Sequence, residues 1–355
     1  MYPVLNIDLN RIEQNMRTIL WECRKRGIEP MGITKAYCAD VYIAQKLLDA
    51  GFCKIGDSRL KNLKNFQDWR VEKILIRIPM SCEVKELVTY ADTALISSVD
   101  TARLIDAEAQ KQQKLFKLIL MMELGDLREG IYGYEALLKA AKTLEQMPAV
   151  HLQGIGTNIG CVSGVTPSAE NMARLAQIKK RLESDIGRKL EVLSAGSSDV
   201  FGFMMREGLP DRINELRIGE ATIMGTNGAE EHIAGLAEHC ITLDAQVVEV
   251  FEKPSVPLGD RSINPFGEAV EVEDIGIRRR AIVALGRQDV HLAFLKPLKK
   301  GAYILAQSSD HTVLDVEECG DVYVGDVLTF QLKYGGILSA FTSGYVDRSY
   351  LSRAE

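Results

Sequence analysis

The feature that most constrains the fold is an alternation along the first two-thirds of the chain. Short apolar segments are each followed by apolar residues at helical spacing. Strands that alternate with helices form parallel sheets, and eight such units are typical of a closed (β/α)8 barrel. A doubly wound open sheet is the alternative. The eight predicted strands are Met31–Thr34, Phe52–Gly56, Lys73–Ile78, Thr93–Ser97, Phe116–Met122, His151–Gly156, Leu190–Ser194 and Glu215–Ile218.

The pattern changes at about residue 236, where short β segments are separated by turn formers such as Asn264-Pro265-Phe266-Gly267. No helix of comparable length is predicted among them. We therefore expect a mainly antiparallel β domain over residues 236–355, a barrel over 9–235, and an N-terminal segment, 1–8, that could pack with the β domain. The predicted strands of the β domain are Ile241–Val250, Arg280–Ala284, Tyr303–Gln307, Thr312–Val316 and Val327–Leu332.

The charge balance and the cysteines exclude several classes of function. The 355 residues include 43 Lys and Arg against 49 Asp and Glu, which gives no electrostatic signature for nucleic acid. No apolar run approaches the ~20 residues of a membrane helix, and no signal peptide is visible. The seven scattered cysteines indicate free thiols in a reducing, cytoplasmic setting. The five histidines lack ligand spacing, so no metal site is expected.

Functional side chains of such barrels gather at the carboxyl ends of the strands. Lys35 follows the first predicted strand, and in a dry site its pKa would fall, so that it could form a Schiff base with an aldehyde. Arg128 lies between Gly125 and Gly130 after a buried strand and could bind a carboxylate or phenolate oxygen. Taken alone, each of these two cations is better explained as a solvated surface residue.

Three further segments carry polar or glycine-rich residues at strand ends. Gly154–Asn158 and Ser194–Ser198 offer the backbone N–H and hydroxyl groups that suit a phosphate, although Gly-Ser turns are common. Arg217, on the last barrel strand, would point inward, and a structural ion pair is the alternative role. In the β domain, His311 follows Asp310 in a predicted turn and could line an active site.

Taken in order, these motifs resemble the alanine-racemase-like family of fold-type III pyridoxal-phosphate enzymes, over essentially the whole chain. The resemblance implies that Lys35 holds the cofactor and that Arg128 lies near its phenolate and the substrate carboxylate. It also implies that Arg217, with Gly219, contacts the pyridine nitrogen. The residues implied for the phosphate are Ser197 or Ser198, Gly225, Thr226, and Tyr334, which follows Gly325-Asp326-Val327.

The chain also departs from the family pattern. Asn158 stands where the family has a histidine near the cofactor ring, and Tyr37 is the nearest tyrosine after the lysine. The second-base tyrosine is replaced within Leu285–Asp289, and the usual Met-Asp segment reads Ser309-Asp310-His311. This set of changes most resembles the ornithine racemase branch. It implies that Ser309 and Asp310 contact the substrate, and we hypothesise that Asp310 or His311 supplies the second acid/base from a partner subunit.

The resemblance implies a homodimeric racemase that interconverts the enantiomers of ornithine or a related basic amino acid. A basic side chain needs an acidic partner, and Glu220, Asp199 and Asp310 are the candidates. Three alternatives remain: an alanine racemase, a decarboxylase on the same scaffold, and a non-catalytic cofactor carrier. Arg217 argues against the decarboxylase, because related decarboxylases place a glutamate at the pyridine nitrogen. The β domain argues against the carrier.

Overall fold

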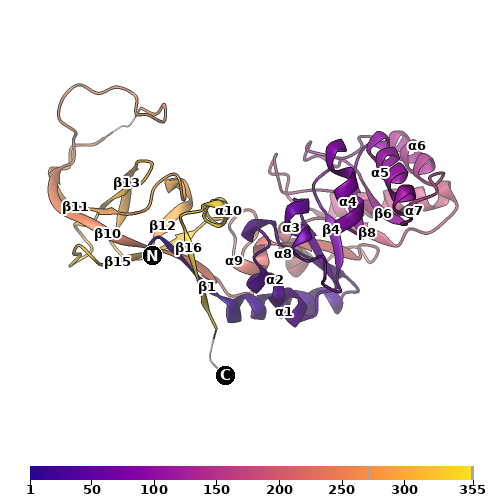
Figure 1. Cartoon of the computed structure of the whole chain (residues 1–355), viewed down its shortest axis with the longest axis horizontal. Coiled ribbons are helices and arrows are strands. Elements are labelled where there is room, and N and C mark those ends of the chain that lie inside the picture. Colours follow the sequence, from indigo (N-terminus) through magenta and orange to yellow (C-terminus); the bar gives the residue numbers. More distant parts are fainter. Residues whose placement is uncertain (270–271, 353–355) are drawn as a thin grey trace. The chain divides into compact units, whose positions relative to one another are not determined.

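The computed structural model describes residues 1–269 and 272–352 and divides the chain into two compact units (Figure 1). One unit is the barrel, within Leu9–Cys240. The other, which we call the β unit, joins Met1–Asp8 to Ile241–Leu351. Of the helices in the described residues, none has the length and apolar character needed to cross a membrane.

The barrel consists of eight parallel strands that close on themselves. Closure comes from β2, which pairs in parallel with β3 on one side and with β9 on the other. This pairing rules out the open-sheet alternative and confirms the predicted barrel. The strands are β2 (Glu29–Ile33), β3 (Lys54–Asp57), β4 (Glu72–Leu75), β5 (Thr93–Ile96), β6 (Phe116–Met121), β7 (Val150–Gly156), β8 (Val192–Ser194) and β9 (Glu215–Ile218).

Helices connect these strands, and their ends carry clear local signals. In α2, the side chain of Asp40 accepts hydrogen bonds from the N–H groups of Tyr42 and Ile43, and Gly51 ends the helix with a φ of +102°. The helices are α1 (Leu9–Arg24), α2 (Val41–Ala50), α3 (Leu60–Lys64), α4 (Val84–Tyr90), α5 (Val99–Lys111), α6 (Tyr134–Leu144), α7 (Ala169–Ile186), α8 (Ser198–Glu207) and α9 (Glu220–Met224).

Buried apolar side chains from the barrel strands pack against one another in at least two clusters. Strands β7 and β8 approach so closely that a Cβ atom on Gly154 would lie 2.2 Å from the carbonyl oxygen of Val192. Only glycine fits at that position. This packing gives the strand ends a rigid base. The cluster members are Leu95, Ile119, Met121 and Val192 in one, and Met31, Ile33 and Ile74 in the other.

The β unit is an eight-stranded, mostly antiparallel sheet (Figure 1). Its main path runs β12-β15-β10-β11-β14-β13, and β1 pairs with β10 and, in parallel, with β16. The strands are β1 (Val4–Asp8), β10 (Ile241–Pro254), β11 (Ile277–Val283), β12 (Leu295–Pro297), β13 (Tyr303–Gln307), β14 (Thr312–Asp315), β15 (Val327–Leu332) and β16 (Asp347–Leu351).

Helix α10 (Tyr334–Thr342) is an element that the sequence pattern did not predict. Gly335 and Gly336 in its first turn weaken the helical signal, because glycine has low intrinsic helix propensity. The ring of Phe294 takes the space that a side chain would need, since a Cβ atom on Gly335 would lie 2.6 Å from it. The helix is therefore set by tertiary packing.

Candidate active site

Lys35 lies directly after β2, at the start of a short 3-10 helix, Lys35–Tyr37. Within the part of the chain that the structure describes, its Nζ atom forms neither a hydrogen bond nor an ion pair. Burial lowers the pKa of Lys35, and the positive charges of Arg128 and Arg217 act in the same direction, while Cys161 and Asp57 oppose them. These effects favour the neutral amine, which is the nucleophilic form.

The turn that carries Lys35 is fixed on both sides. Before it, the hydroxyl of Thr34 donates a 2.6 Å hydrogen bond to the buried carboxylate of Asp57 at the end of β3. After it, Tyr37 is fully buried, and burial raises the pKa of its hydroxyl well above the usual range. The lysine therefore extends from an ordered strand end.

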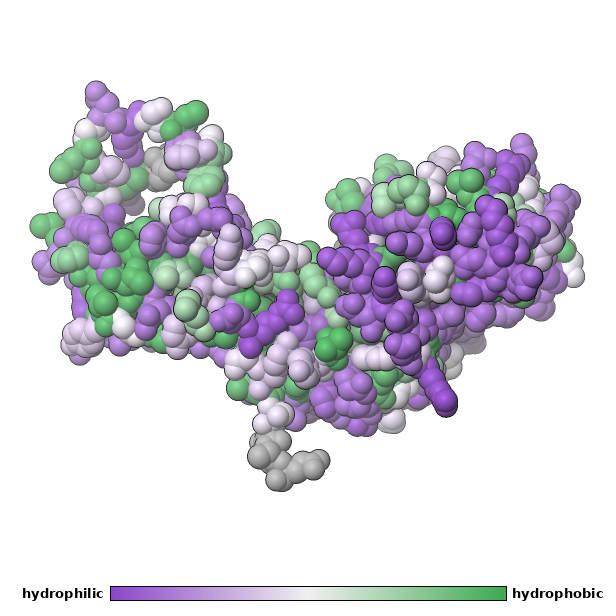
Figure 2. Space-filling view, in the orientation of Figure 1, coloured by the Kyte–Doolittle hydropathy of each residue, from purple (hydrophilic) through white to green (hydrophobic). Residues whose placement is uncertain are grey.

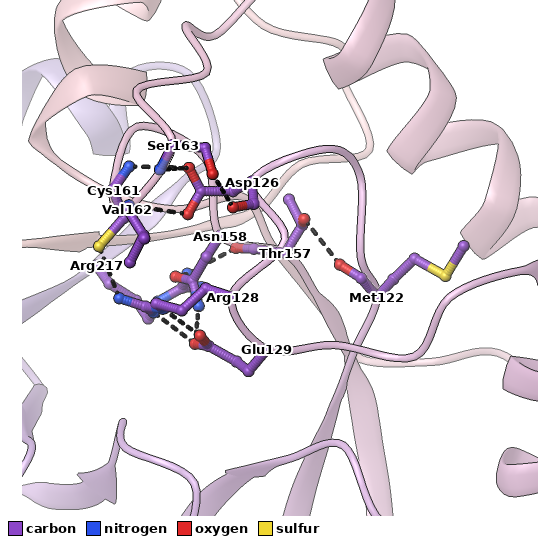
Figure 3. Close-up of polar contacts among 10 residues, drawn as sticks. All are labelled: Met122, Asp126, Arg128, Glu129, Thr157, Asn158, Cys161, Val162, Ser163 and Arg217. Carbon is purple, nitrogen blue, oxygen red and sulfur yellow. Dashed lines mark hydrogen bonds and ion pairs between the residues drawn. The ribbon is translucent and has the colours of Figure 1, made fainter.

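Arg217 reaches from β9 to the ends of the two preceding strands and is only 6% exposed (Figure 3). Its guanidinium donates to the hydroxyl of Ser194 at 2.6 Å, and at 2.7 Å to both the carbonyl of Thr157 and the side-chain oxygen of Asn158. Burial lowers its pKa to about 10, so it stays protonated at neutral pH. Among the described residues, Arg217 forms no ion pair. The alternative role predicted for it, as a member of a structural ion pair, is therefore excluded for the residues that the structure describes.

Arg128 lies in the loop between β6 and α6, with its guanidinium engaged on two sides (Figure 3). Two of its nitrogens, Nε and Nη2, donate to the two carboxylate oxygens of Glu129. Its Nη1 lies 2.8 Å from the sulfur of Cys161, in the loop after β7. The side-chain amide of Asn158 also donates to Glu129. A continuous chain of polar contacts thus runs from Arg128 through Glu129 and Asn158 to Arg217.

Asp126 ties the loop that carries Arg128 to the loop that follows β7. Its carboxylate accepts hydrogen bonds of 3.2–3.4 Å from the backbone N–H groups of Cys161, Val162 and Ser163. In return, the hydroxyl of Ser163 donates to the backbone carbonyl of Asp126 at 2.7 Å (Figure 3). Sequence reasoning missed both Asp126 and Glu129. The only signal was the run of acids after a buried strand, which a solvated loop also explains.

A hydrogen bond from Ala221 to Ser198 joins the first turn of α9 to the first turn of α8. Ser197 caps α8, since its hydroxyl accepts from the N–H of Asp199, and the hydroxyl of Ser198 accepts from the N–H of Ala221 in α9 at 3.0 Å. Gly219 begins α9 so close to β2 that a Cβ atom would lie 3.1 Å from that of Ile33. Hydroxyl and backbone N–H groups at helix starts are the donors that suit a phosphate.

Gly225 and Thr226 lie at the other end of α9. Gly225 ends the helix with a φ of +72°, and the hydroxyl of Thr226 donates to the carboxylate of Glu220 at 3.0 Å. Burial raises the pKa of Glu220 to about 7, with Asp199 and Glu230 adding to the rise and Lys35 opposing it. Glu220 is therefore a carboxylate that a nearby cation would stabilise in its charged form.

Asp199 is a second acid of this kind. Its carboxylate accepts 3.0 Å hydrogen bonds from the hydroxyl of Ser197 and the N–H of Gly228, and burial raises its pKa. Neither Asp199 nor Glu220 forms an ion pair within the described ranges. Two of the three acids predicted to recognise a basic side chain thus belong to the barrel, next to the α8 and α9 starts.

The remaining predicted site residues belong to the β unit. Ser309, Asp310 and His311 lie in the turn between β13 and β14, and Tyr334 begins α10. This turn packs on the segment after β11, because a Cβ atom on Gly286 would lie 1.9 Å from the carbonyl oxygen of Ser309. Asp310 accepts from Gln288 at 2.6 Å. The structure thus brings together the two segments that differ most from the family pattern.

Solved structures show the same combination of a parallel barrel and a β unit in one chain. An alanine racemase from Streptomyces lavendulae has a TM-score of 0.78 at 16% identity, over 99% of this chain and 97% of that one. A D-threonine aldolase from Filomicrobium marinum has a TM-score of 0.75 at 16% identity, over 96% and 89%. At these identities, the likeness shows the fold.

The family follows from sequence similarity. The model of the alanine racemase N-terminal domain matches residues 7–227. An ornithine racemase of Acetoanaerobium sticklandii is 36% identical over 99% of this chain and 100% of its own length. A lysine racemase of Thermotoga maritima is 39% identical over 99% of both. This chain therefore belongs to the alanine racemase family, and the resemblance to its ornithine racemase branch is supported.

Proposed function

We propose that the protein is a pyridoxal-phosphate-dependent amino-acid racemase that acts on ornithine, lysine or a related basic amino acid. The observation that carries the proposal is the half-buried Lys35 amine directly after β2, whose pKa is lowered by desolvation and by the positive charges of Arg128 and Arg217. The full-length relatives named for ornithine and lysine racemisation support both the reaction and the class of substrate.

The donor set of the barrel fits this cofactor. A free amine at Lys35 suits its aldehyde, and the buried Arg217 suits its pyridine nitrogen. The donors around the α8 and α9 starts suit its phosphate. When bound, pyridoxal phosphate supplies the electron withdrawal that makes the α-proton of an amino acid acidic. The residues assigned to hold it are Lys35, Arg128, Asn158, Ser197, Ser198, Arg217, Gly225, Thr226 and Tyr334.

Different residues of this chain are assigned to proton transfer, to substrate binding and to contact with the cofactor ring. We assign to the Lys35 amine the exchange of the α-proton on one face of the substrate. Arg128 binds the substrate carboxylate, with Ser309 and Asp310 as further contacts. Arg217 keeps its own proton, since its pKa of about 10 lies well above neutrality, so it donates a hydrogen bond rather than a proton. This favours reversible proton transfer over decarboxylation.

The second acid/base is assigned to Asp310 or His311, contributed by the partner subunit of a homodimer. Both side chains lie in an exposed turn of the β unit. The same unit also exposes apolar side chains, including Phe251, Tyr323 and Val324, and Figure 2 shows apolar surface over the region of β10 and β15. An exposed apolar patch of this kind is typical of an interaction surface. Among the described residues, the seven cysteines form no disulfide, which supports a reducing, cytoplasmic location.

The test is to incubate the purified protein, loaded with pyridoxal phosphate, with L-ornithine, L-lysine and L-alanine in separate reactions. Chiral chromatography follows the D-enantiomer, and released carbon dioxide is measured in parallel. We expect both basic amino acids to racemise without gas, and alanine to react more slowly. Gas release would indicate a decarboxylase, faster alanine turnover would indicate an alanine racemase, and no change in any substrate would favour a cofactor carrier.

A further inference from the structure

Glu129 is a carboxylate in the centre of the site that the proposed function leaves without a role. Its side chain is 14% exposed and lies between Arg128 and Asn158 (Figure 3). Both carboxylate oxygens accept from Arg128, and the oxygen that accepts from Nη2 also accepts from the amide of Asn158. Three donors therefore converge on one small group.

The contacts of Glu129 determine which part of Arg128 remains available. A guanidinium has five N–H donors in a rigid plane. Glu129 takes one from Nε and one from Nη2, and Cys161 takes one from Nη1. One N–H on each terminal nitrogen is left for a bound carboxylate or phenolate oxygen. A planar group held along one edge in this way presents its opposite donors in a defined direction.

Asn158 extends this control to the second arginine. Its amide nitrogen donates to Glu129, while its amide oxygen accepts from Arg217 at 2.7 Å. The two ends of the amide are not interchangeable, because an anion faces one end and a cation faces the other. The residue that departs from the family histidine thus serves as an oriented bridge between the Glu129–Arg128 pair and Arg217.

The charges explain why an anion is needed at this place. The positive charges of Arg128 and Arg217 each disfavour the charged form of Lys35, so three basic side chains act on one another near the end of β2. The carboxylate of Glu129 acts against this positive charge, bonding Arg128 directly and favouring the charged form of Arg217 through space. Two neighbouring guanidinium groups held without an anion would repel each other.

We propose that Glu129 is a positioning residue that sets the orientation of Arg128 for the substrate carboxylate and, through Asn158, couples Arg128 to Arg217. This inference rests on the proposed function, because it concerns the same site. Glu129 itself need not touch the substrate. We expect replacement of Glu129 to weaken carboxylate binding and to raise KM more than it lowers the stability of the fold.

The test compares Glu129→Gln, which removes the charge at nearly constant shape, with Glu129→Asp, which keeps the charge but shortens the reach. The matched control is Glu145→Gln, because Glu145 also holds an arginine, Arg188, through two hydrogen bonds of 2.6–2.7 Å. Each variant is assayed for KM and kcat with L-ornithine, and for its melting temperature. Equilibrium binding of propionate, a carboxylate without an amine, is measured by isothermal titration calorimetry on the loaded protein.

We expect Glu129→Gln to lose about 10²-fold in kcat/KM, mainly through a higher KM, because small displacements of a binding group have effects of this size. Propionate binding weakens in parallel, Glu129→Asp lies between Glu129→Gln and wild type, and Glu145→Gln behaves as wild type. Unchanged propionate affinity and KM in Glu129→Gln would overturn the inference. So would an equal loss in Glu145→Gln, or a Glu129→Asp variant no better than Glu129→Gln.

Two controls keep these outcomes distinct. If Glu129→Gln does not fold, Glu129→Asp decides, and wild-type KM and propionate affinity in that variant would count against the inference. If wild-type protein racemises no amino acid, the proposed function fails. Propionate binding then still reports whether Glu129 orients Arg128 for a carboxylate.

Discussion

At Lys35, burial and two nearby guanidinium groups lower the pKa of a single amine. The same residue follows a strand whose end is tied to Asp57 through Thr34. Local order and electrostatics therefore favour the same state, a neutral amine in a defined place. That combination is what covalent capture of an aldehyde requires.

The titration of Glu220 makes the stability of the protein depend on pH. Its pKa is raised to about 7, whereas an unfolded glutamate titrates near its model value of 4.5. Between these values the folded state binds more protons than the unfolded state, so this residue lowers stability as pH rises through that window. Glu220→Gln should remove the penalty, which is at most about 3 kcal/mol, while its amide oxygen can still accept from Thr226.

The measurement is thermal unfolding of wild type and Glu220→Gln at pH 4.5 and pH 8, without added coenzyme. We expect nearly equal melting temperatures at the lower pH and a higher melting temperature for the variant at pH 8. An equal difference at both pH values would show that charge at Glu220 is not the cause.

At the scale of elements, the loops after β6 and β7 form one unit, because Asp126 joins them through three backbone amides. Asp126→Asn leaves a single acceptor oxygen and places an amide donor against backbone N–H groups. We expect faster hydrogen exchange at residues 161–163 and a loss of about 1–3 kcal/mol in stability. Asp100→Asn, at an exposed carboxylate, is the control. Unchanged exchange at these amides would contradict the role given to Asp126.

The elements that the sequence predicts well are those whose signal is local. The barrel strands are short segments rich in apolar residues, because parallel strands are buried on both faces, and Lys35 could therefore be placed directly after one strand and Arg217 within another. Strand β16 was missed because its partner is β1, at the opposite end of the chain. The role of Asp126 and the link from Glu129 to Asn158 were missed because both depend on contacts with the loop after β7, which has no sequence periodicity.

For the whole molecule, we propose a site that is shared between two subunits, and mixing two inactive variants tests this. We expect Lys35→Ala to be inactive, and Asp310→Asn combined with His311→Asn to be inactive as well. Co-expressed, they should form heterodimers with one complete site and recover part of the racemase activity. Full activity in the second variant alone, or inactive heterodimers of confirmed composition, would contradict the shared site.

The most direct test of the account is hydride reduction of the protein after incubation with pyridoxal phosphate, followed by peptide mapping. Reduction locks an imine into a stable secondary amine, so the attachment point can be identified by mass. We expect the label on the peptide that contains Lys35, and its loss in Lys35→Ala. An unlabelled protein, or a label on a different lysine, would contradict it.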